Sequence, residues 1–156
     1  MKADKRFVKS GTSSTPVASS KAAIEKMLLR YGASAFQVMQ DYKEGKVIVS
    51  FSLPNTAGAE TMVPVRIPVE ITKVAAALYG PLKKDQSYTK SGMEQAERVT
   101  WRNLVLWIDA ALSATTIGLQ TISEAFFAHT LVEGERIVDI CDRELPSVKR
   151  LMAGNG

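Results

Sequence analysis

The 156-residue chain has few of the residues that usually carry chemistry: one cysteine, one histidine and no long apolar run. Its single cysteine, Cys141, cannot form an intramolecular disulfide or a thiolate metal cluster, which favours a reducing compartment. No stretch approaches the roughly eighteen apolar residues of a membrane span, and the basic N-terminus lacks the apolar segment of a signal peptide. The sequence therefore predicts a cytoplasmic protein with no membrane partner.

Catalytic motifs are also scarce. His129 is the only histidine and follows two phenylalanines, a setting in which a partnered structural histidine is more frequent than a general base. No second His or Cys lies at metal-ligand spacing, and no glycine-rich phosphate-binding loop occurs. The acid pairs Glu94/Glu97 and Asp139/Asp142 stand at i, i+3, a spacing typical of a solvated helix surface. The sequence thus predicts a protein that is not an enzyme and has no catalytic residue, metal site or cofactor.

The charge that the sequence does have is concentrated near its N-terminus. Residues 1–30 carry seven lysines and arginines against two acids, whereas the other 126 residues carry 13 against 14. Residues 10–20 are small and polar, so residues 1–19 are predicted to form a flexible basic arm. Such an arm either tethers the protein to phosphates or an acidic partner, or only keeps it soluble. The bases of the tether would be Lys2, Lys5, Arg6 and Lys9.

Hydrophobic spacing predicts one helix and then three strands. The helix would begin with Ser19 or Ser20 as its N-cap and end at Gly32. From Ala35 the apolar residues alternate with polar ones, which indicates a β-hairpin followed by a third strand over 61–69. Prolines at 64 and 68 cannot donate to a ladder, so this third strand is expected at the edge of the sheet. The apolar stripe of the first helix consists of Ile24, Met27, Leu28 and Tyr31.

The second half of the sequence is mainly helical. Ser91 and Glu94 have the spacing of a capping box at the start of a long helix that would end at Gly118. The same spacing at Thr121 and Glu124 opens a shorter helix. The stretch 136–141 is a short strand or a helix start, and Pro146 is expected to separate it from a last basic turn. The apolar stripe of the long helix consists of Trp101, Leu104, Val105, Ile108, Ala111 and Leu112.

These elements predict an α+β fold, in which a three-stranded antiparallel sheet packs on a long central helix with flanking helices. The sequence places this single domain at residues 20–146. It would lie between the basic arm, 1–19, and a C-terminal turn and tail, 147–156.

The long helix carries the densest candidate binding motif. Arg98 and Arg102 stand at i, i+4 and share a helix face, where two guanidinium groups beside an indole could grip phosphates and stack a base on Trp107. Alternatively, Glu94 pairs with Arg98 while both tryptophans fill the core. The sheet offers Lys46 and Arg66 as further phosphate contacts.

The pattern Arg98-x-x-Trp101-Arg102-x-Leu104 resembles a family of small uncharacterised proteins carried by bacteriophages, prophages and other mobile elements. The resemblance spans about residues 20–140, and the Trp-Arg helix is its most specific part. It implies a genomic setting and no particular activity, because no biochemical function is established for that family. The family pattern has a lysine where Asp109 to Ala111 stand here, which weakens the helix as a basic surface. The other shared segments are Arg30-Tyr31-Gly32-Ala33 with Phe36, Ile122 to Phe127, and Glu133-Gly134.

Together these observations favour an accessory protein of a phage or mobile element that binds nucleic acid without catalysis. The expected ligand is single-stranded DNA, in replication or recombination, in the cytoplasm of a bacterial host cell. The alternative is a protein-interaction module, either an assembly subunit or an inhibitor of a host protein. Self-association as a homo-oligomer is compatible with both.

Overall fold

The computed structural model describes residues 10–55 and 60–153, and for residues 146–153 the backbone alone. Its first element is helix α1, Val17–Arg30, which buries Ile24 and Leu28 of the predicted apolar stripe. The helix begins with Pro16 as its N-cap, so the predicted start at Ser19 or Ser20 is wrong. Ser20 lies inside the helix and is buried by tertiary packing, so it does not act as the N-cap.

Three antiparallel strands follow in the order β1-β2-β3: β1 is Ala35–Asp41, β2 is Lys46–Pro54 and β3 is Met62–Glu70. The register pairs Phe36 with Phe51 and Val49 with Ile67. Because side chains alternate along a strand, this register places one apolar set on one face. The buried members of that set are Val47, Val49, Phe51, Leu53, Val63, Val65 and Ile67.

Strand β3 lies at an edge of this sheet, as its prolines predict. Pro64 is opposite Ser52 and Pro68 is opposite Ile48, so β3 has its ladder with β2. On its other side the structure records an isolated bridge between Val65 and Thr130. The prolines therefore end the growth of the sheet beyond β3.

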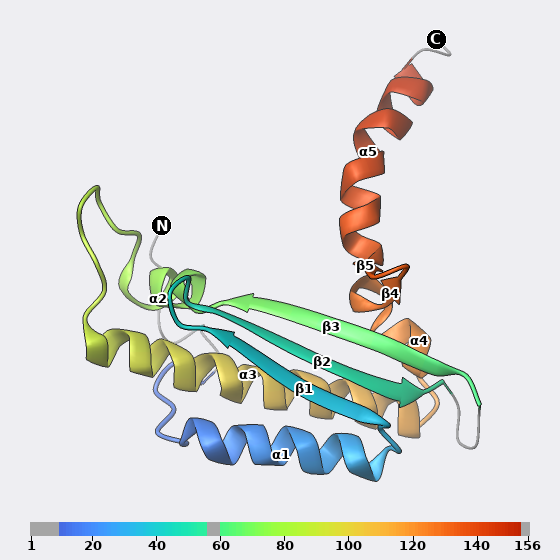
Figure 1. The fold of residues 1–156 in the computed structure, drawn as a ribbon, viewed down its shortest axis with the longest axis horizontal. Helices are drawn as coiled ribbons and strands as arrows, with labels where there is room; N and C mark the ends of the chain where they lie inside the picture. The colour runs from blue at the N-terminus through green and yellow to red at the C-terminus, as the bar shows by residue number, and fades with distance from the viewer. Residues whose placement is uncertain (1–9, 56–59, 154–156) are drawn as a thin grey trace.

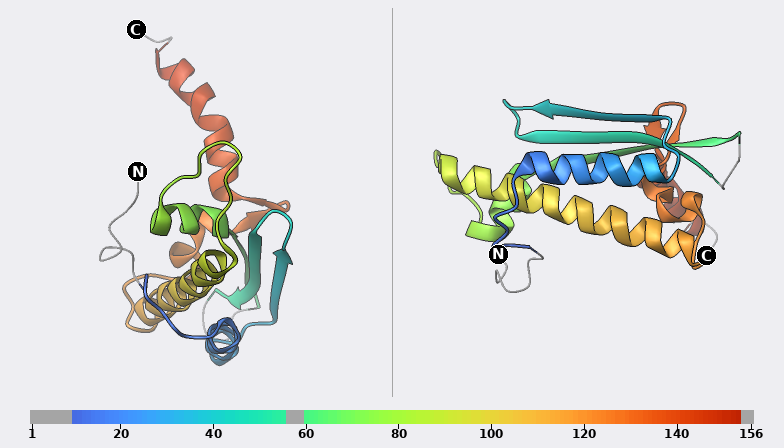
Figure 2. Two further views of the ribbon diagram at one scale, coloured as in Figure 1. Left: turned by 90° about the vertical axis from the view of Figure 1, so that its left-hand side faces the viewer. Right: turned by 90° about the horizontal axis from the view of Figure 1, so that it is seen from below.

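Helices cover the inner face of the sheet, and Figure 2 shows the two layers from the end of the molecule. Helix α2, Ile71–Tyr79, and the 27-residue helix α3, Lys90–Thr116, pack against each other, and α1 packs beside α3. The predicted fold, a three-stranded antiparallel sheet on a long central helix with flanking helices, is confirmed. The whole predicted apolar stripe of α3 is buried.

The ends of α3 differ from the sequence interpretation. Its N-cap is Thr89, whose side chain accepts a hydrogen bond from the Gly92 amide, so the predicted Ser91 capping box is wrong. The helix ends at Thr116, and Gly118 follows at φ 79°, a conformation that glycine adopts without strain. The second predicted capping box, Thr121 with Glu124, is present at the start of helix α4, Ile122–Ala125.

After α4 come a 3₁₀ turn η1, Phe127–His129, and two short paired strands, β4 (Leu131–Val132) and β5 (Glu135–Arg136). Helix α5, Ile137–Ala153, then projects from the body (Figure 1). It runs through Pro146, so the predicted break into a turn and tail is wrong. Pro146 frees the carbonyl of Asp142, and that residue is exposed on the projecting helix, where water can replace the lost donor. No helix in the described ranges is long and apolar enough to cross a membrane.

Candidate nucleic-acid interface

The structure does not bring the candidate residues of the sequence together. Arg98 and Arg102 lie on α3, in the helix layer, and neither is among the buried residues of that helix. Arg66 is exposed between the buried residues Val65 and Ile67, so it points away from the helices on the far side of the sheet. Trp107 lies about 140° around α3 from Arg102. The predicted site is therefore divided among three separate surfaces.

The two arginines of α3 form a ridge that joins the N-terminal segment. Arg98 donates two hydrogen bonds to Gln95 Oε1, from Nε at 3.0 Å and from Nη2 at 2.6 Å. The Gln95 amide in turn donates to the backbone oxygens of Gly11, at 3.3 Å, and Ser13, at 3.0 Å. Gln95 thus fixes the segment at residues 10–13 beside the ridge. The sequence analysis did not identify Gln95, and its position one turn before Arg98 was the available signal.

The expected pairing of Glu94 with Arg98 is not present, since Arg98 uses the uncharged Gln95 instead. The positive charge of Arg98 is consequently not neutralised by that contact. Arg102 makes no hydrogen bond or ion pair within the part of the chain that the structure describes. Both side chains are half-buried, so the ridge presents its charged groups with part of each stem packed.

The four bases of the basic arm lie outside the described residues: Lys2, Lys5, Arg6 and Lys9. What the structure gives is the attachment of the arm, because Ser10 to Ser13 run next to Gln95. The arm therefore joins the body at the Arg98 end of the ridge.

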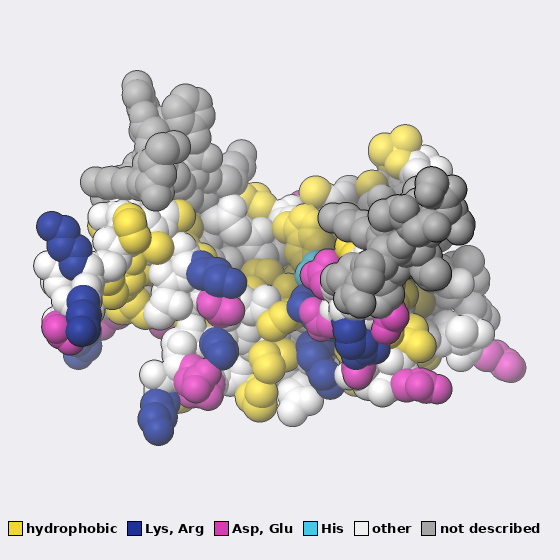
Figure 3. Space-filling view, turned by 90° about the horizontal axis from the view of Figure 1, so that it is seen from above, with side chains coloured by type: hydrophobic (Ala, Val, Ile, Leu, Met, Phe, Trp, Pro, Cys, Tyr) yellow, Lys and Arg dark blue, Asp and Glu magenta, His cyan; other side chains and the backbone are white. Residues whose placement is uncertain are grey.

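The sheet bases have local partners that reduce their value for phosphate binding. Lys46 Nζ donates to Glu44 Oε2 at 2.6 Å, and this hydrogen bond with the Glu44 charge raises the pKa of Lys46. Arg66 Nη1 donates to the backbone oxygen of Gly134 at 3.3 Å. Arg66 also lines a hollow of about 300 Å³ on the outer face of the sheet, with Gln37, Met39, Ile48 and Ser50. Figure 3 shows acidic and basic side chains interspersed on the side of the molecule seen from above.

The Trp107 ring packs edge-to-face against two neighbouring rings. Its ring meets Phe126 at 5.7 Å and His129 at 5.5 Å between centroids, both nearly perpendicular. The side chain is 38% exposed and lines an apolar groove between α2 and α3. Trp107 lies about 140° around α3 from Arg102, so it does not share the face of the arginine ridge.

Trp101, in contrast, is a core residue, as the alternative interpretation predicts. It is 0% exposed, and Lys21 Nζ lies 4.9 Å from its ring centroid. Lys21 also donates to Gln40 Oε1 at 3.3 Å, and the Gln40 amide donates to Glu97 Oε1 at 2.8 Å. One base of the basic N-terminal region thus joins α1, β1 and α3, a structural role that the sequence analysis missed.

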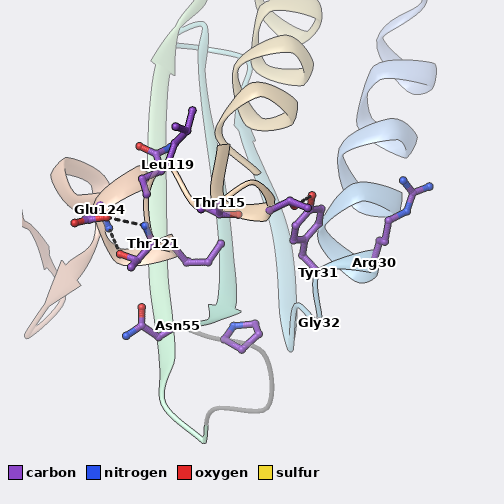
Figure 4. A pocket seen from close by; sticks show the side chains of 13 residues that line it. Arg30, Tyr31, Gly32, Asn55, Thr115, Leu119, Thr121 and Glu124 are labelled. Carbon is purple, nitrogen blue, oxygen red and sulfur yellow. Dashed lines mark hydrogen bonds between the residues drawn. The ribbon is translucent and has the colours of Figure 1, made fainter. Parts of the chain in front are cut away.

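A cavity of about 940 Å³ opens between the end of α1, the end of α3 and α4 (Figure 4). Its polar groups already bind one another: Tyr31 Oη lies 2.6 Å from Thr116 Oγ1, and Ser123 donates to Asn55 at 2.7 Å. Thr121 and Glu124 complete the capping box. In the described ranges no three His, Cys, Asp or Glu residues gather to hold a metal ion.

His129, the only histidine of the chain, contacts two neighbouring side chains. Arg136 Nη1 lies 3.2 Å from His129 Nδ1, and the imidazole packs edge-on against Trp107. Burial, followed by the charge of Arg136, lowers the pKa of His129. Cys141 is exposed on α5 with no disulfide partner among the described residues.

Comparison with known proteins adds no identification: no protein-family model, curated protein or solved structure matches this chain.

Proposed function

We propose that this is a non-catalytic accessory protein of a bacteriophage or mobile element that binds single-stranded DNA, in replication or recombination, in the cytoplasm of a bacterial host. One observation carries the proposal. Gln95 joins the attachment point of the basic arm to the Arg98–Arg102 ridge, so two sources of positive charge begin at the same place. The resemblance to phage and mobile-element proteins supplies the setting.

Which bases contact the DNA follows from which of them already have a partner within the protein. Arg98 and Arg102 contact phosphates, and Lys2, Lys5, Arg6 and Lys9 extend the contact along the strand. Lys46 is paired with Glu44 and Arg66 faces the opposite side of the sheet, so neither belongs to this surface. Trp107 is likewise excluded, because it packs against Phe126 on another face of α3.

A salt titration on a labelled oligonucleotide tests the proposal. Each neutralised phosphate contributes about −0.7 to the slope of log K against log[salt] for single strands. Replacing the four arm bases with glutamine is therefore expected to flatten the slope by up to about 3 units. Arg98→Ala with Arg102→Ala is expected to weaken binding at every salt concentration.

The matched control is Lys83→Ala with Lys84→Ala, which removes two exposed bases from the connection between α2 and α3. This variant should bind like the wild type, because the connection is not part of the ridge. Absence of binding by the wild type at about 50 mM salt would contradict the proposal. Equal affinity for a duplex of the same length would remove the preference for single strands.

A second candidate, a protein-interaction module that assembles with its own kind or inhibits a host protein, rests on the outer face of the sheet. No described helix covers this face, and Met39 is exposed beside the hollow that Ile48 and Ser50 line. Met39→Glu should abolish biological activity, with an unchanged thermal melt, if this face binds a protein. If that variant keeps its activity and the wild type binds DNA, the second candidate is contradicted and the first is supported.

A further inference from the structure

The two edges of the three-stranded sheet differ in their ability to pair with a further strand. Strand β3 carries Pro64 and Pro68, and its Val65 forms the isolated bridge with Thr130. Proline lacks the N–H that a ladder needs, so this edge is blocked. Strand β1, at the other edge, contains no proline, glycine or lysine over Ala35–Asp41. None of the residues that usually protect a sheet edge is therefore present in β1.

Strand β1 is regular, and its outer side is unpaired. Its seven residues pair one to one with residues of β2, so no bulge turns the edge away. Half of the backbone N–H and C=O groups of an edge strand point away from its neighbour. Within the described ranges, no strand other than β2 pairs with β1. Figure 2 shows β1 at the outer border of the sheet in both views. The backbone of β1 thus offers hydrogen-bonding groups that suit an extended strand.

The side chains of β1 are also incompletely covered. On the inner face, Phe36 and Val38 are partly buried, whereas their partners on β2, Phe51 and Val49, are 3% and 0% exposed. On the outer face, Met39 is 53% exposed. A strand added beside β1 would remove apolar area from water on both faces of the sheet, which favours pairing.

The residue pattern of β1 is complementary to itself when two copies run antiparallel. A two-fold axis at Gln37 places Phe36 opposite Val38 of the second copy, and Ala35 opposite its Met39. Apolar side chains then meet apolar ones on both faces, and the two Gln37 amides meet at the axis. The pattern of β1 therefore fits a second β1.

Charge does not oppose this pairing. The one charged residue of β1 is Asp41, whose carboxylate accepts hydrogen bonds from the Lys43 and Glu44 amides in the turn to β2. In the register centred on Gln37, Asp41 lies opposite Ala33 of the second copy, so no like charges face each other. The other strands of this sheet are unsuitable partners, because β2 is paired on both sides and β3 carries the prolines.

We propose that β1 of a second copy of this chain pairs with β1, antiparallel and centred on Gln37, so that two sheets join into one of six strands. Each copy contributes the same edge, and the proline-blocked β3 edges end the assembly at two copies. The axis is perpendicular to the sheet, so both helix layers lie on the same side. The contact uses neither the arginine ridge nor the arm, and it is therefore independent of DNA binding.

Cross-linking at the axis tests the register. In full-length protein with Cys141→Ser, which removes the native thiol, Gln37→Cys places two thiols opposite each other. Directly opposite residues have Cβ atoms about 4.5–5.5 Å apart, close enough for a disulfide after small adjustment. Mild oxidation should give a covalent dimer on a non-reducing gel. The matched control is Met39→Cys, on the same face of β1, whose two copies would lie about 14 Å apart along the strands and should remain monomeric.

The mass in solution supplies the second measurement. Light scattering of the wild type, without nucleic acid, should give about twice the 17.0 kDa of one chain. Gln37→Lys and Gln37→Glu should each reduce the mass to one chain, because like charges then meet at the axis. An equimolar mixture of the two variants should recover dimers. The control Gln86→Lys, on the exposed connection between α2 and α3, should keep the wild-type mass. Circular dichroism checks that each variant is folded.

Three results would overturn the proposal. A wild type with the mass of one chain throughout a dilution series would show that the β1 edge takes no second copy. Equal cross-linking of Met39→Cys and Gln37→Cys would show that the thiols meet by collision or in another register. A Gln37→Lys variant that keeps the mass of two chains would place the dimer contact elsewhere. None of these results depends on whether the protein binds DNA.

Discussion

Helices α3 and α5 show two ways in which one chain uses a helix. Helix α3 has 27 residues, nine of them buried, and packs against the sheet, α1 and α2. Helix α5 has 17 residues and contacts the body at its base, through η1 and β5. The first helix holds the fold together by burial, and the second is oriented by ion pairs at one end.

The comparison indicates that α3 stabilises the fold, whereas the projecting part of α5 adds little to global stability. Burial of apolar area is the main favourable term in folding, so α3 should unfold with the whole domain. A helix with few buried contacts can open locally at a lower free energy. Mutations in α3 should therefore lower global stability, whereas mutations beyond the base of α5 should change helix content.

The largest expected effect is at Trp101, which is 0% exposed in α3. Its Nε1 has no hydrogen-bond partner in the described structure, so it stabilises the fold through packing. Trp101→Ala should lower the free energy of unfolding by about 3–5 kcal/mol in urea denaturation. Trp107→Ala, at a partly exposed position of the same helix, should cost less. Equal losses in the two variants would contradict the assignment of Trp101 to the core.

A glycine placed in each helix sharpens the comparison with a smaller effect. Ala110→Gly, at an exposed position of α3, should lower the free energy of unfolding by about 0.5–1 kcal/mol. Asp142→Gly, at an exposed position of α5, should leave the global transition unchanged and reduce the helical circular dichroism signal. Tryptophan fluorescence measures the global transition, because Trp101 and Trp107 both lie in α3. A matching loss in Asp142→Gly would show that α5 folds cooperatively with the body.

The smallest expected effect comes from the protonation of His129, which contacts Trp107 of α3 and Arg136 at the start of α5. Burial and the Arg136 charge lower the pKa of His129 in the folded protein, while in the unfolded chain it is near 6.5. The unfolded state thus binds more protons as the pH falls below about 6.5. The contribution of His129 is fully present above that pH and is lost as the pH falls through the folded pKa.

The urea midpoints of wild type and His129→Gln, measured at neutral and mildly acidic pH, separate this contribution from other groups. Asp139 is the main neighbour that also responds, because its hydrogen bond with Arg136 lowers its pKa. The difference between the two proteins should shrink towards acidic pH. A difference that is constant with pH would mean that His129 titrates alike in the folded and unfolded states.

The fold was predictable where periodicity and burial agree. Alternation in β2 and β3 placed Val49 and Ile67 on the inner face, and the 3–4 spacing in α3 placed Trp101 and Ile108 in the core. Helix ends were less predictable, because a Thr or Ser near a helix start is an equally good cap in several positions. Thr89 acts where Ser91 was expected, and Pro146 is tolerated where a break was expected.

The candidate site was less accessible to prediction. Spacing of i, i+4 correctly puts Arg98 and Arg102 on one helix face, but it gives no information about Gln95 and the segment that Gln95 binds. The sequence assigns Lys46 and Arg66 to the sheet, as a second candidate surface. Only the packing of the sheet on the helices shows that both face away from α3.

The sequence by itself determined helices α1 and α3, the three strands with the inner face of their sheet, and the concentration of basic residues before residue 31. These depend on local backbone preference and on which side chains avoid water. The tertiary structure alone decided that Lys21 contacts Trp101, that Trp107 packs against Phe126, and that α5 leaves the body. The reason is physical: such contacts join residues far apart in the chain, and their positions are set only when the two layers pack together.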